Sequence, residues 1–157
     1  MPRRPQRTGT ARASARAKVR TATLSDAKPI AGLVTALGYP TNATDMKARL
    51  ASIFADPTYA TFVAELDGEV VGMAGACLAR FYEKPGRYAR LVALVVSEAS
   101  LGRGAGAALV GAVEKWGANN DAGEIFLNSG VQREAAREFY ERLGYRVSGV
   151  RFTKELG

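Results

Sequence analysis

A glycine-rich segment carries the strongest chemical signal in this chain. Gly102, Gly104 and Gly106 follow the apolar run 89–96 and precede a stretch with helical periodicity. A helix that begins here leaves the backbone N–H groups of its first turn unpaired, and the helix dipole adds partial positive charge there. Glycine removes the side chains that would keep an anion away from these amides. The pattern predicts a pyrophosphate site; the alternative is a turn that only packs closely against its neighbours.

Two common nucleotide-binding motifs do not fit this segment. A Rossmann site needs the register G-x-G-x-x-G and usually opens a series of strand–helix–strand units, for which too little sequence remains. A P-loop needs Gly-Lys-Ser/Thr after the glycines, whereas Ala107 and Ala108 follow here. Neither type of nucleotide site is therefore expected.

The residue types that are missing limit the chemistry further. The chain has no histidine and a single cysteine, Cys77. This excludes Ser-His-Asp and Cys-His catalysis, zinc sites of cysteine and histidine, and disulfides within the chain, and no metal site is expected. Cys77 lies in an apolar run and is expected in the core. Any reaction must use tyrosine, carboxylates, backbone amides or a cofactor.

A second motif lies further along the chain, centred on Tyr140. Residues 136–145 read Ala-Arg-Glu-Phe-Tyr-Glu-Arg-Leu-Gly-Tyr, and residues 101–106 read Leu-Gly-Arg-Gly-Ala-Gly. Together they resemble the GCN5-related N-acetyltransferase (GNAT) superfamily, whose loop reads Q/R-x-x-G-x-G/A and whose helix reads A-x-x-x-Y-x-x-x-G-F/Y. The resemblance covers roughly residues 17–155. Two motifs in the right order are more specific than either alone.

The resemblance implies an enzyme that transfers the acetyl group of acetyl-CoA, a co-substrate, to a primary amine by direct attack in a ternary complex. Backbone groups of Leu94 and Val96 would bind the pantetheine arm as a neighbouring strand does, and the amides after them would hold the pyrophosphate. The residues expected to bind acetyl-CoA are Leu94, Val95, Val96, Leu101, Gly102, Arg103, Gly104, Ala105, Gly106, Ala107, Arg133 and Ala136.

Tyr140 matches the family tyrosine that donates a proton to the leaving thiolate. A phenol suits this role because its reference pKa of about 10 keeps it protonated at neutral pH. The alternative is an aromatic core residue beside Phe139 and Leu143.

Two positions near the phosphates depart from the family pattern. Leu101 replaces the usual arginine or glutamine, so one side-chain contact to phosphate is missing, and Arg103 is the candidate to compensate. Arg133 replaces an asparagine common before the tyrosine motif. The site itself is expected to remain, because its main donors are backbone amides.

The general base is unassigned. Val92 lies where many family members carry a strand glutamate that acts as a base through water. The candidates are Glu65, Glu83 and Glu98. With no plausible nucleophile, an acetyl-enzyme intermediate is not expected.

The acceptor is expected to bind between two aromatic loops, at residues 38–40 and 81–83. Aromatic rings with a carboxylate suit a cationic amine, although exposed loop aromatics often only pack. The sequence leaves open whether this amine belongs to a small molecule or a peptide, and whether the protein is a homodimer.

The elements that must position these motifs follow from periodicity and turn residues. Strands are predicted over 17–21, 61–66, 70–81, 89–96 and 124–128, with one or two more over 145–155, and helices over 26–37, 44–56, 105–119 and 132–143. The run 89–96 is apolar enough for a central strand buried on both faces. The fold class is α/β, a GNAT-type mixed, mostly antiparallel sheet of six to seven strands, splayed at its central strands, with about four helices on its faces.

The distribution of charged residues divides the chain into a basic N-terminal tail and a formally neutral domain. Seven of the 22 basic residues precede the first acid, Asp26, and the remaining 15 balance the 15 acids. Residues 1–16 are therefore predicted to be a disordered basic tail, with an organelle presequence as the alternative, and 17–157 the acetyltransferase domain. The neutral body argues against nucleic-acid binding by the folded part. With no apolar run of about 20 residues and no secretory signal, no membrane contact and a cytoplasmic location are expected.

Three functions remain in competition. The first is the acetyltransferase; the second is a non-catalytic acyl-CoA-binding or sensor module, favoured by Val92 at the base position. The third is binding of nucleic acid or an anionic surface through the tail.

Overall fold

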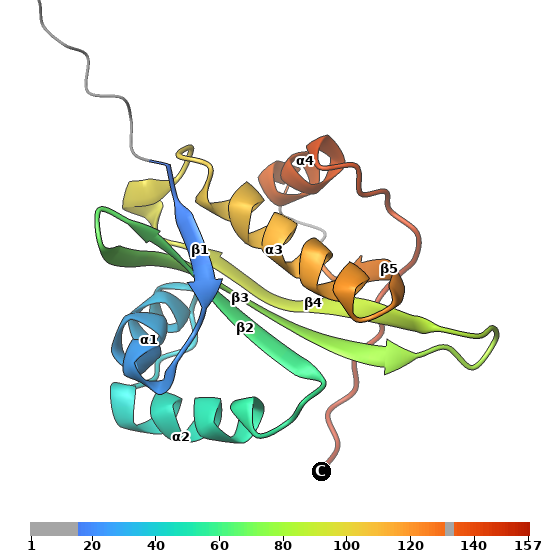
Figure 1. The fold of residues 1–157 in the computed structure, drawn as a ribbon, viewed down its shortest axis with the longest axis horizontal. Helices are drawn as coiled ribbons and strands as arrows, with labels where there is room; N and C mark the ends of the chain where they lie inside the picture. The colour runs from blue at the N-terminus through green and yellow to red at the C-terminus, as the bar shows by residue number, and fades with distance from the viewer. Residues whose placement is uncertain (1–15, 131–133) are drawn as a thin grey trace, which may run out of the picture.

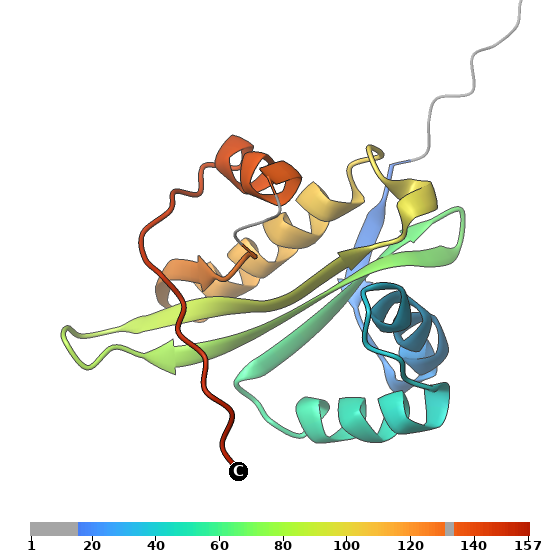
Figure 2. The ribbon, with the colours of Figure 1, turned by 180° about the vertical axis from the view of Figure 1, so that it is seen from behind.

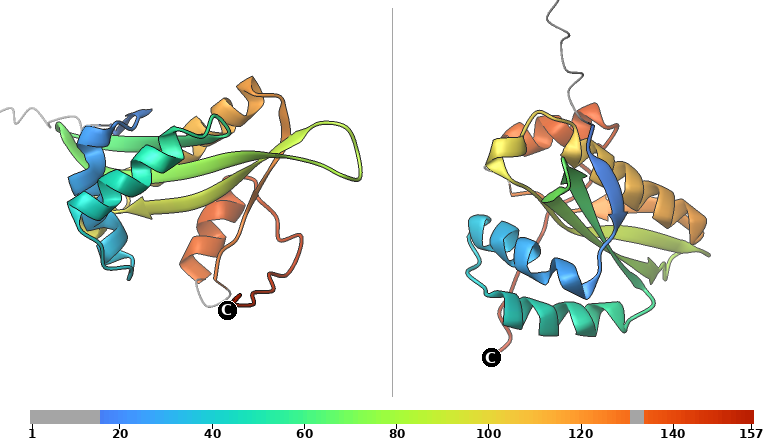
Figure 3. Two further views of the ribbon diagram at one scale, coloured as in Figure 1. Left: turned by 90° about the horizontal axis from the view of Figure 1, so that it is seen from below. Right: turned by 60° about the vertical axis from the view of Figure 1, so that its left-hand side comes forward.

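The structure is a computed structural model that describes residues 16–130 and 134–157. Its elements are β1 (Lys18–Thr21), α1 (Ala27–Ala36), α2 (Ala43–Phe54), β2 (Tyr59–Leu66), β3 (Glu69–Arg80), β4 (Arg87–Val96), α3 (Ala105–Asn119), β5 (Ala122–Leu127) and α4 (Glu134–Arg142), with single-turn 3-10 helices at Leu24–Asp26 and Glu98–Ser100. One sheet separates α1 and α2 on one face from α3 on the other (Figures 1 and 3). Side chains of α4 pack at the margin of the core beneath α3. The predicted tail lies outside the described residues except for Arg16.

The sheet has the strand order β1-β2-β3-β4-β5. Its first three pairings are antiparallel, and β4 pairs with β5 in parallel. Asp67 and Gly68 join β2 to β3 with φ angles of 51° and 81°, the left-handed conformation that a two-residue hairpin turn favours. An Asp-Gly pair between two apolar runs is itself a sequence signal for a hairpin turn of this kind. The parallel pairing needs a crossover, which α3 supplies.

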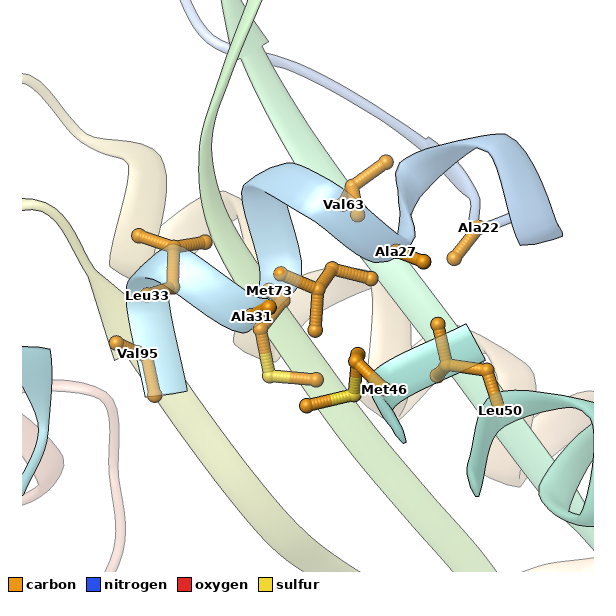
Figure 4. Close-up of a cluster of buried hydrophobic side chains, with 10 residues drawn as sticks. Ala22, Ala27, Ala31, Leu33, Met46, Leu50, Val63, Met73 and Val95 are labelled. Atoms are coloured by element: carbon orange, nitrogen blue, oxygen red, sulfur yellow. The ribbon is translucent and has the colours of Figure 1, made fainter. Parts of the chain in front are cut away.

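Alternation along the strands produces two cores, one on each face of the sheet. Val63, Met73 and Val95 face α1 and α2, where they pack with buried residues such as Ile30 and Leu50 (Figure 4). The opposite core joins Ala64, Ala74, Ala76 and Leu91 of the strands to Ala105, Leu109, Val110 and Val113 of α3. The buried apolar residues of α1, α2 and α3 therefore face the sheet.

Helix α3 lies very close to the strands beneath it. A Cβ placed on Gly72 would come within 3.0 Å of Leu109 Cδ1 and of the Val95 carbonyl oxygen. Glycine at this position therefore lets α3 pack closely against β3 and β4.

At 15 residues α3 is the longest helix in the described part of the chain. None of the helices described is long and apolar enough to cross a membrane.

The predicted number of six to seven strands is wrong for residues 16–130 and 134–157, whose sheet has five strands. The strands expected over 145–155 do not form: the chain after α4 has no regular secondary structure, and every residue from Arg146 to Gly157 is exposed. Alternating apolar residues give this segment strand character, but a strand also needs a neighbour to receive its hydrogen bonds.

Candidate active site

The candidate site lies where β4 and β5 separate. The two strands pair only from Arg87, opposite Ala122, to Leu91, opposite Leu127. β4 then continues to Val96, and beyond Leu91 this edge faces no strand in the described part of the chain. A cleft of about 1310 Å³ opens there. The predicted splay of the central strands is thus present, between β4 and β5.

A β-bulge shapes the middle of the cleft. Gly75 pairs with Ala93 and Ala76 pairs with Leu91, so Val92 has no partner on β3. An extra residue of this kind bends a strand and turns side chains in a new direction. Val92 is 55% exposed and lines the cleft. The prediction that 89–96 is buried on both faces is therefore wrong at this residue and at the exposed Arg90.

The glycine segment forms a turn that leads directly into α3. Gly102 and Gly104 have φ angles of 77° and 83°, which L side chains rarely adopt. A Cβ on either glycine would meet no atom within 4 Å, so backbone conformation, and not space, is what favours glycine here. Gly104 is the residue before the helix, and its carbonyl oxygen accepts the first helical bond from Ala108 N at 3.0 Å.

The amides at the start of α3 therefore border the cleft. The amides in the first turn of an α-helix have no helical acceptor, and the dipole concentrates positive charge around them. Gly104, Ala105, Gly106 and Ala107 all line the cleft. This arrangement fits an anion such as a diphosphate.

Tyr140 reaches the same cleft from α4. Its ring packs edge-on against Phe139 and Tyr145, with centroid distances of 5.0 and 5.7 Å. Burial among these rings raises the pKa of its phenol above the ordinary value of 10.0. The hydroxyl forms no hydrogen bond with residues 16–130 or 134–157. Tyr140 is thus both a packed aromatic residue and a protonated phenol at the cleft.

A second tyrosine anchors the helix that carries Tyr140. The Tyr145 hydroxyl donates a 2.9 Å hydrogen bond to Glu114 Oε1 on α3. The Tyr145 backbone N–H donates to the Tyr140 carbonyl at 3.0 Å, closing the end of α4. Burial and the Glu114 carboxylate together raise the pKa of Tyr145. The sequence showed Tyr145 only as the last letter of a motif, and its partner Glu114 was not singled out.

Most residues predicted to bind acetyl-CoA line this one cleft. They are Leu94, Val95, Val96, Leu101, Gly102, Gly104, Ala105, Gly106, Ala107 and Ala136. Arg103 is exposed and is not among the lining residues. Arg133 lies outside the described residues. The structure thus brings together residues from β4, the glycine turn, α3 and α4.

None of the three carboxylates considered as general bases is among the residues that line the cleft. Glu65 accepts a 2.8 Å hydrogen bond from Arg20 Nε, beside the buried Asp26. Glu98 lies in the short helix before the glycine turn, and Glu83 borders a separate pocket. No carboxylate lines the large cleft among the residues that the structure describes.

The two aromatic loops expected to frame one acceptor pocket are separated. Tyr39 lines the large cleft, together with Arg49 of α2, which sequence reasoning missed. Residues 81–83 instead border a pocket of about 380 Å³, where Phe81 packs with Tyr88 and Phe126. No sequence signal marked Arg49, because its approach to β4 depends on how α2 packs.

The same part of the chain matches a known family. The sequence pattern of the acetyltransferase (GNAT) family matches residues 28–145. The chain belongs to the GNAT family of acetyltransferases. The resemblance inferred from the glycine and tyrosine motifs is confirmed.

Solved GNAT structures have the same fold. A GNAT acetyltransferase from Staphylococcus aureus is 30% identical, with a TM-score of 0.77 over 90% of this chain and 99% of that one. A putative acetyltransferase from Agrobacterium tumefaciens is 23% identical, with a TM-score of 0.81 over 88% and 99%. The aminoglycoside N-acetyltransferase AAC(6')-Iy, solved with CoA, is 20% identical, with a TM-score of 0.81 over 92% and 97%. No protein with a curated description matches the chain significantly.

The described residues contain no cluster of three histidine, cysteine, aspartate or glutamate side chains that could hold a metal ion. The residues that could bind a cofactor are instead those of the β4 edge and the α3 amides. Their donors suit an elongated molecule with a peptide-like arm and a diphosphate.

Proposed function

We propose that this GNAT protein is an N-acetyltransferase that moves the acetyl group of acetyl-CoA to a primary amine by direct attack. One observation carries the proposal: the unpaired edge of β4 runs into the glycine turn at the start of α3, in the same cleft as Tyr140. The strand edge and the anion site can bind an acyl-CoA, and the phenol can donate a proton as the thioester is cleaved.

The binding part of the proposal rests on backbone groups. Peptide groups of residues 94–96 have a free edge, and the amide-bearing arm of CoA can pair with it as a strand would. The diphosphate meets the amides that begin α3, where Gly102 and Gly104 leave open space. Leu101 is 64% exposed at this turn, so it offers only apolar surface to the phosphates.

The chemical part of the proposal rests on Tyr140. Acetyl-CoA supplies a thioester, whose carbonyl carbon forms the new bond to the amine nitrogen as the carbon–sulfur bond breaks. The electron pair goes to sulfur, and Tyr140 donates its phenolic proton to that sulfur. The attacking nitrogen loses one proton to solvent water, and the phenolate regains its proton from solvent. The raised pKa favours the protonated phenol at neutral pH. Cys77 pairs with Arg90 within the sheet and is not among the lining residues, which supports direct attack over an acetyl-cysteine.

A small-molecule amine is the proposed acceptor. It would enter on the side of the cleft lined by Tyr39, Arg49 and the bulged Val92. Solved neighbours include an aminoglycoside acetyltransferase in complex with sisomicin and a glucosamine-6-phosphate N-acetyltransferase from Arabidopsis thaliana. Both names describe acetyl transfer to small amines, which supports this class without selecting a member.

One observation favours a second candidate, a non-catalytic acyl-CoA-binding module. The described lining of the cleft contains no carboxylate that could take a proton from the amine. Incubation with acetyl-CoA and a panel of amines separates the two, with thiol release followed over time. Amine-dependent release that Tyr140→Phe reduces supports the enzyme. Tight CoA binding by calorimetry, with no release from any amine at pH 7 to 9, supports the module.

A further inference from the structure

The described lining of the cleft carries charge of one sign only. Arg49 and Arg142 line it, and no aspartate or glutamate does so within residues 16–130 and 134–157. A cationic amine therefore finds no counter-ion among these residues, and a polycationic amine is repelled by both arginines. An acceptor that also carries an anionic group is attracted instead. The charge of the cleft thus selects among classes of acceptor.

The two arginines belong to opposite sides of the sheet. Helix α2, which carries Arg49, packs with α1 on one face, whereas α3 lies on the other (Figure 2). Arg142 belongs to α4, where Phe139 Cζ lies 3.3 Å from the position of a Cβ placed on Gly106. Helix α4 therefore contacts the proposed diphosphate end of the cleft. Arg49 reaches the cleft from the face opposite α3, so the diphosphate does not account for it.

Arg49 has no ionic partner in the ranges that the structure describes. Its guanidinium takes part in none of the salt bridges found there, and the residue is exposed. Asp45, one turn earlier on α2, is placed for an i, i+4 pair. The Asp45 carboxylate instead accepts a 3.0 Å hydrogen bond from Asn42 Nδ2. The N–H donors of Arg49 therefore remain available to a ligand.

The loop between α1 and α2 fixes the shape of this end of the cleft. Gly38 has a φ of 112°, and its N–H donates to the Thr35 carbonyl at 3.0 Å. The Tyr39 N–H donates to the Val34 carbonyl at 3.2 Å, which completes a Schellman motif at the end of α1. Thr35 Oγ1 also donates to the Thr41 carbonyl and accepts from the Thr41 N–H, both at 3.1 Å. A loop held in this way needs little ordering when a ligand binds.

We propose that the acceptor is an amine that also carries a carboxylate or phosphate group, and that Arg49 binds this anionic group. The inference rests on the proposed function and names the class of acceptor that it leaves open. A guanidinium can bind either group through two parallel hydrogen bonds. With the anion held at α2, the amine extends towards β4, where the bulged Val92 lines the cleft. Arg49 is thus a specificity-determining residue that does not touch the reacting atoms.

Matched pairs of acceptors test the anionic group directly. Glucosamine 6-phosphate is compared with glucosamine, and phenylalanine with phenylethylamine, with thiol release from acetyl-CoA followed over time. In at least one pair the acidic member should have a kcat/KM about 30-fold higher, and this ratio should fall as salt rises. A preference confined to the first pair identifies phosphate as the anion, and one confined to the second identifies carboxylate. Faster transfer to the neutral members or to a polycationic amine would overturn the inference.

Variants of α2 locate the anion site. Arg49→Gln should reduce the ratio within a pair to a few-fold, because the amide is neutral, and Arg49→Lys should keep part of it as a point charge. Lys47→Gln removes the same charge from an exposed position that does not line the cleft, and as the matched control it should keep the full ratio. Thermal melting checks that each variant folds. A ratio that survives in folded Arg49→Gln, or is lost only in Arg142→Gln, would overturn the role of Arg49. Weaker CoA binding by Arg49→Gln would do the same.

Binding without turnover separates this inference from the proposed function. In the CoA-loaded full chain, an acidic acceptor should shift the nitrogen-15 resonance of the Arg49 Nε–H group, and its neutral partner should not. If this shift occurs but no amine is acetylated, only the proposed function is contradicted. If amines are acetylated but the acidic members neither shift this resonance nor react faster, only the acceptor class is wrong. Absence of both shift and transfer across all pairs would overturn both.

Discussion

The two ends of the cleft are built in different ways. The end proposed to bind the coenzyme uses backbone groups from one continuous stretch, residues 94–107, in which a free strand edge leads into a glycine turn and a helix. The acceptor end uses side chains from separate elements, such as Tyr39 after α1, Arg49 on α2 and Val92 on β4. A site of backbone amides tolerates many side-chain changes, whereas a site of side chains can change its ligand with a single residue. Under the proposed function, this difference means that the coenzyme site can be recognised from the sequence, whereas the acceptor cannot.

The largest expected effect comes from placing a charge in the coenzyme end. Gly104→Asp should weaken CoA binding at least about 100-fold, because a carboxylate then stands before the amides proposed to bind the diphosphate. The positive φ of Gly104 also adds strain, so melting temperature is measured alongside calorimetric titration. Gly111→Asp, on the exposed face of the same helix, is the control and should bind normally. Unchanged affinity in folded Gly104→Asp would remove the diphosphate from this turn.

Tyr140 lines the same cleft and should affect the rate without affecting coenzyme binding. Tyr140→Phe keeps the ring packing and removes the proton, so kcat should fall about 100-fold with little change in KM for acetyl-CoA. Tyr145→Phe is the matched control: it loses the bond to Glu114, worth about 1 kcal/mol of stability, but should keep most of kcat. If Tyr140→Phe retained a rate within a few-fold of the parent, Tyr140 would be a packing residue only.

Val92→Glu tests whether the acceptor end lacks a base. The bulge exposes this side chain to the cleft, so a glutamate there can accept a proton from the attacking amine. We expect kcat/KM for the acceptor to rise about tenfold below the pKa of the amine, with CoA affinity unchanged. Val92→Gln is the isosteric control that cannot act as a base. An equal gain from glutamine would show that the side chain improves contact and not proton transfer.

A smaller gain is expected at the coenzyme end from Leu101→Arg. Leu101 is exposed at the turn, so arginine can replace it without emptying a packed space. A charge-assisted contact to phosphate in a solvated loop is worth about 1 kcal/mol, which is several-fold in affinity and weakens as salt rises. Titration with CoA at low and high salt measures it. Weaker binding together with a lower melting temperature would mean that Leu101 holds the shape of the turn.

The last prediction is that kcat does not change with pH through ionisation of Tyr140 over the neutral and mildly alkaline range. Burial holds the pKa of Tyr140 above 10.0, so the phenol keeps its proton throughout neutral and mildly alkaline pH and loses it only above that value. With both substrates saturating, kcat should therefore show no decline attributable to Tyr140 below about pH 10. A decline with a midpoint below 10 that disappears in Tyr140→Phe would contradict the raised pKa.

Local patterns were enough to predict most elements and most of the residues that line the cleft from β4 to α3. The Asp67-Gly68 hairpin, the strand leading into Gly102–Gly106 and the helix carrying Tyr140 all depend on residues close in sequence. The general base candidates could not be placed in this way. Glu65 was a candidate base by residue type alone. Only the folded chain reveals that its carboxylate already accepts a hydrogen bond from Arg20.

The sequence by itself determined the order of the elements, the two motifs and hence the family. These depend on backbone preferences and periodicity, which act between near neighbours in the chain. Only the tertiary structure decided where β4 separates from β5, that Val92 bulges into the opening, and that Arg49 approaches it. It also decided that residues 146–157 stay out of the sheet, despite their strand-like alternation. The physical reason is that a strand edge stays open, or a side chain exposed, only where no other segment packs against it. Whether another segment does so depends on residues that are distant in the sequence.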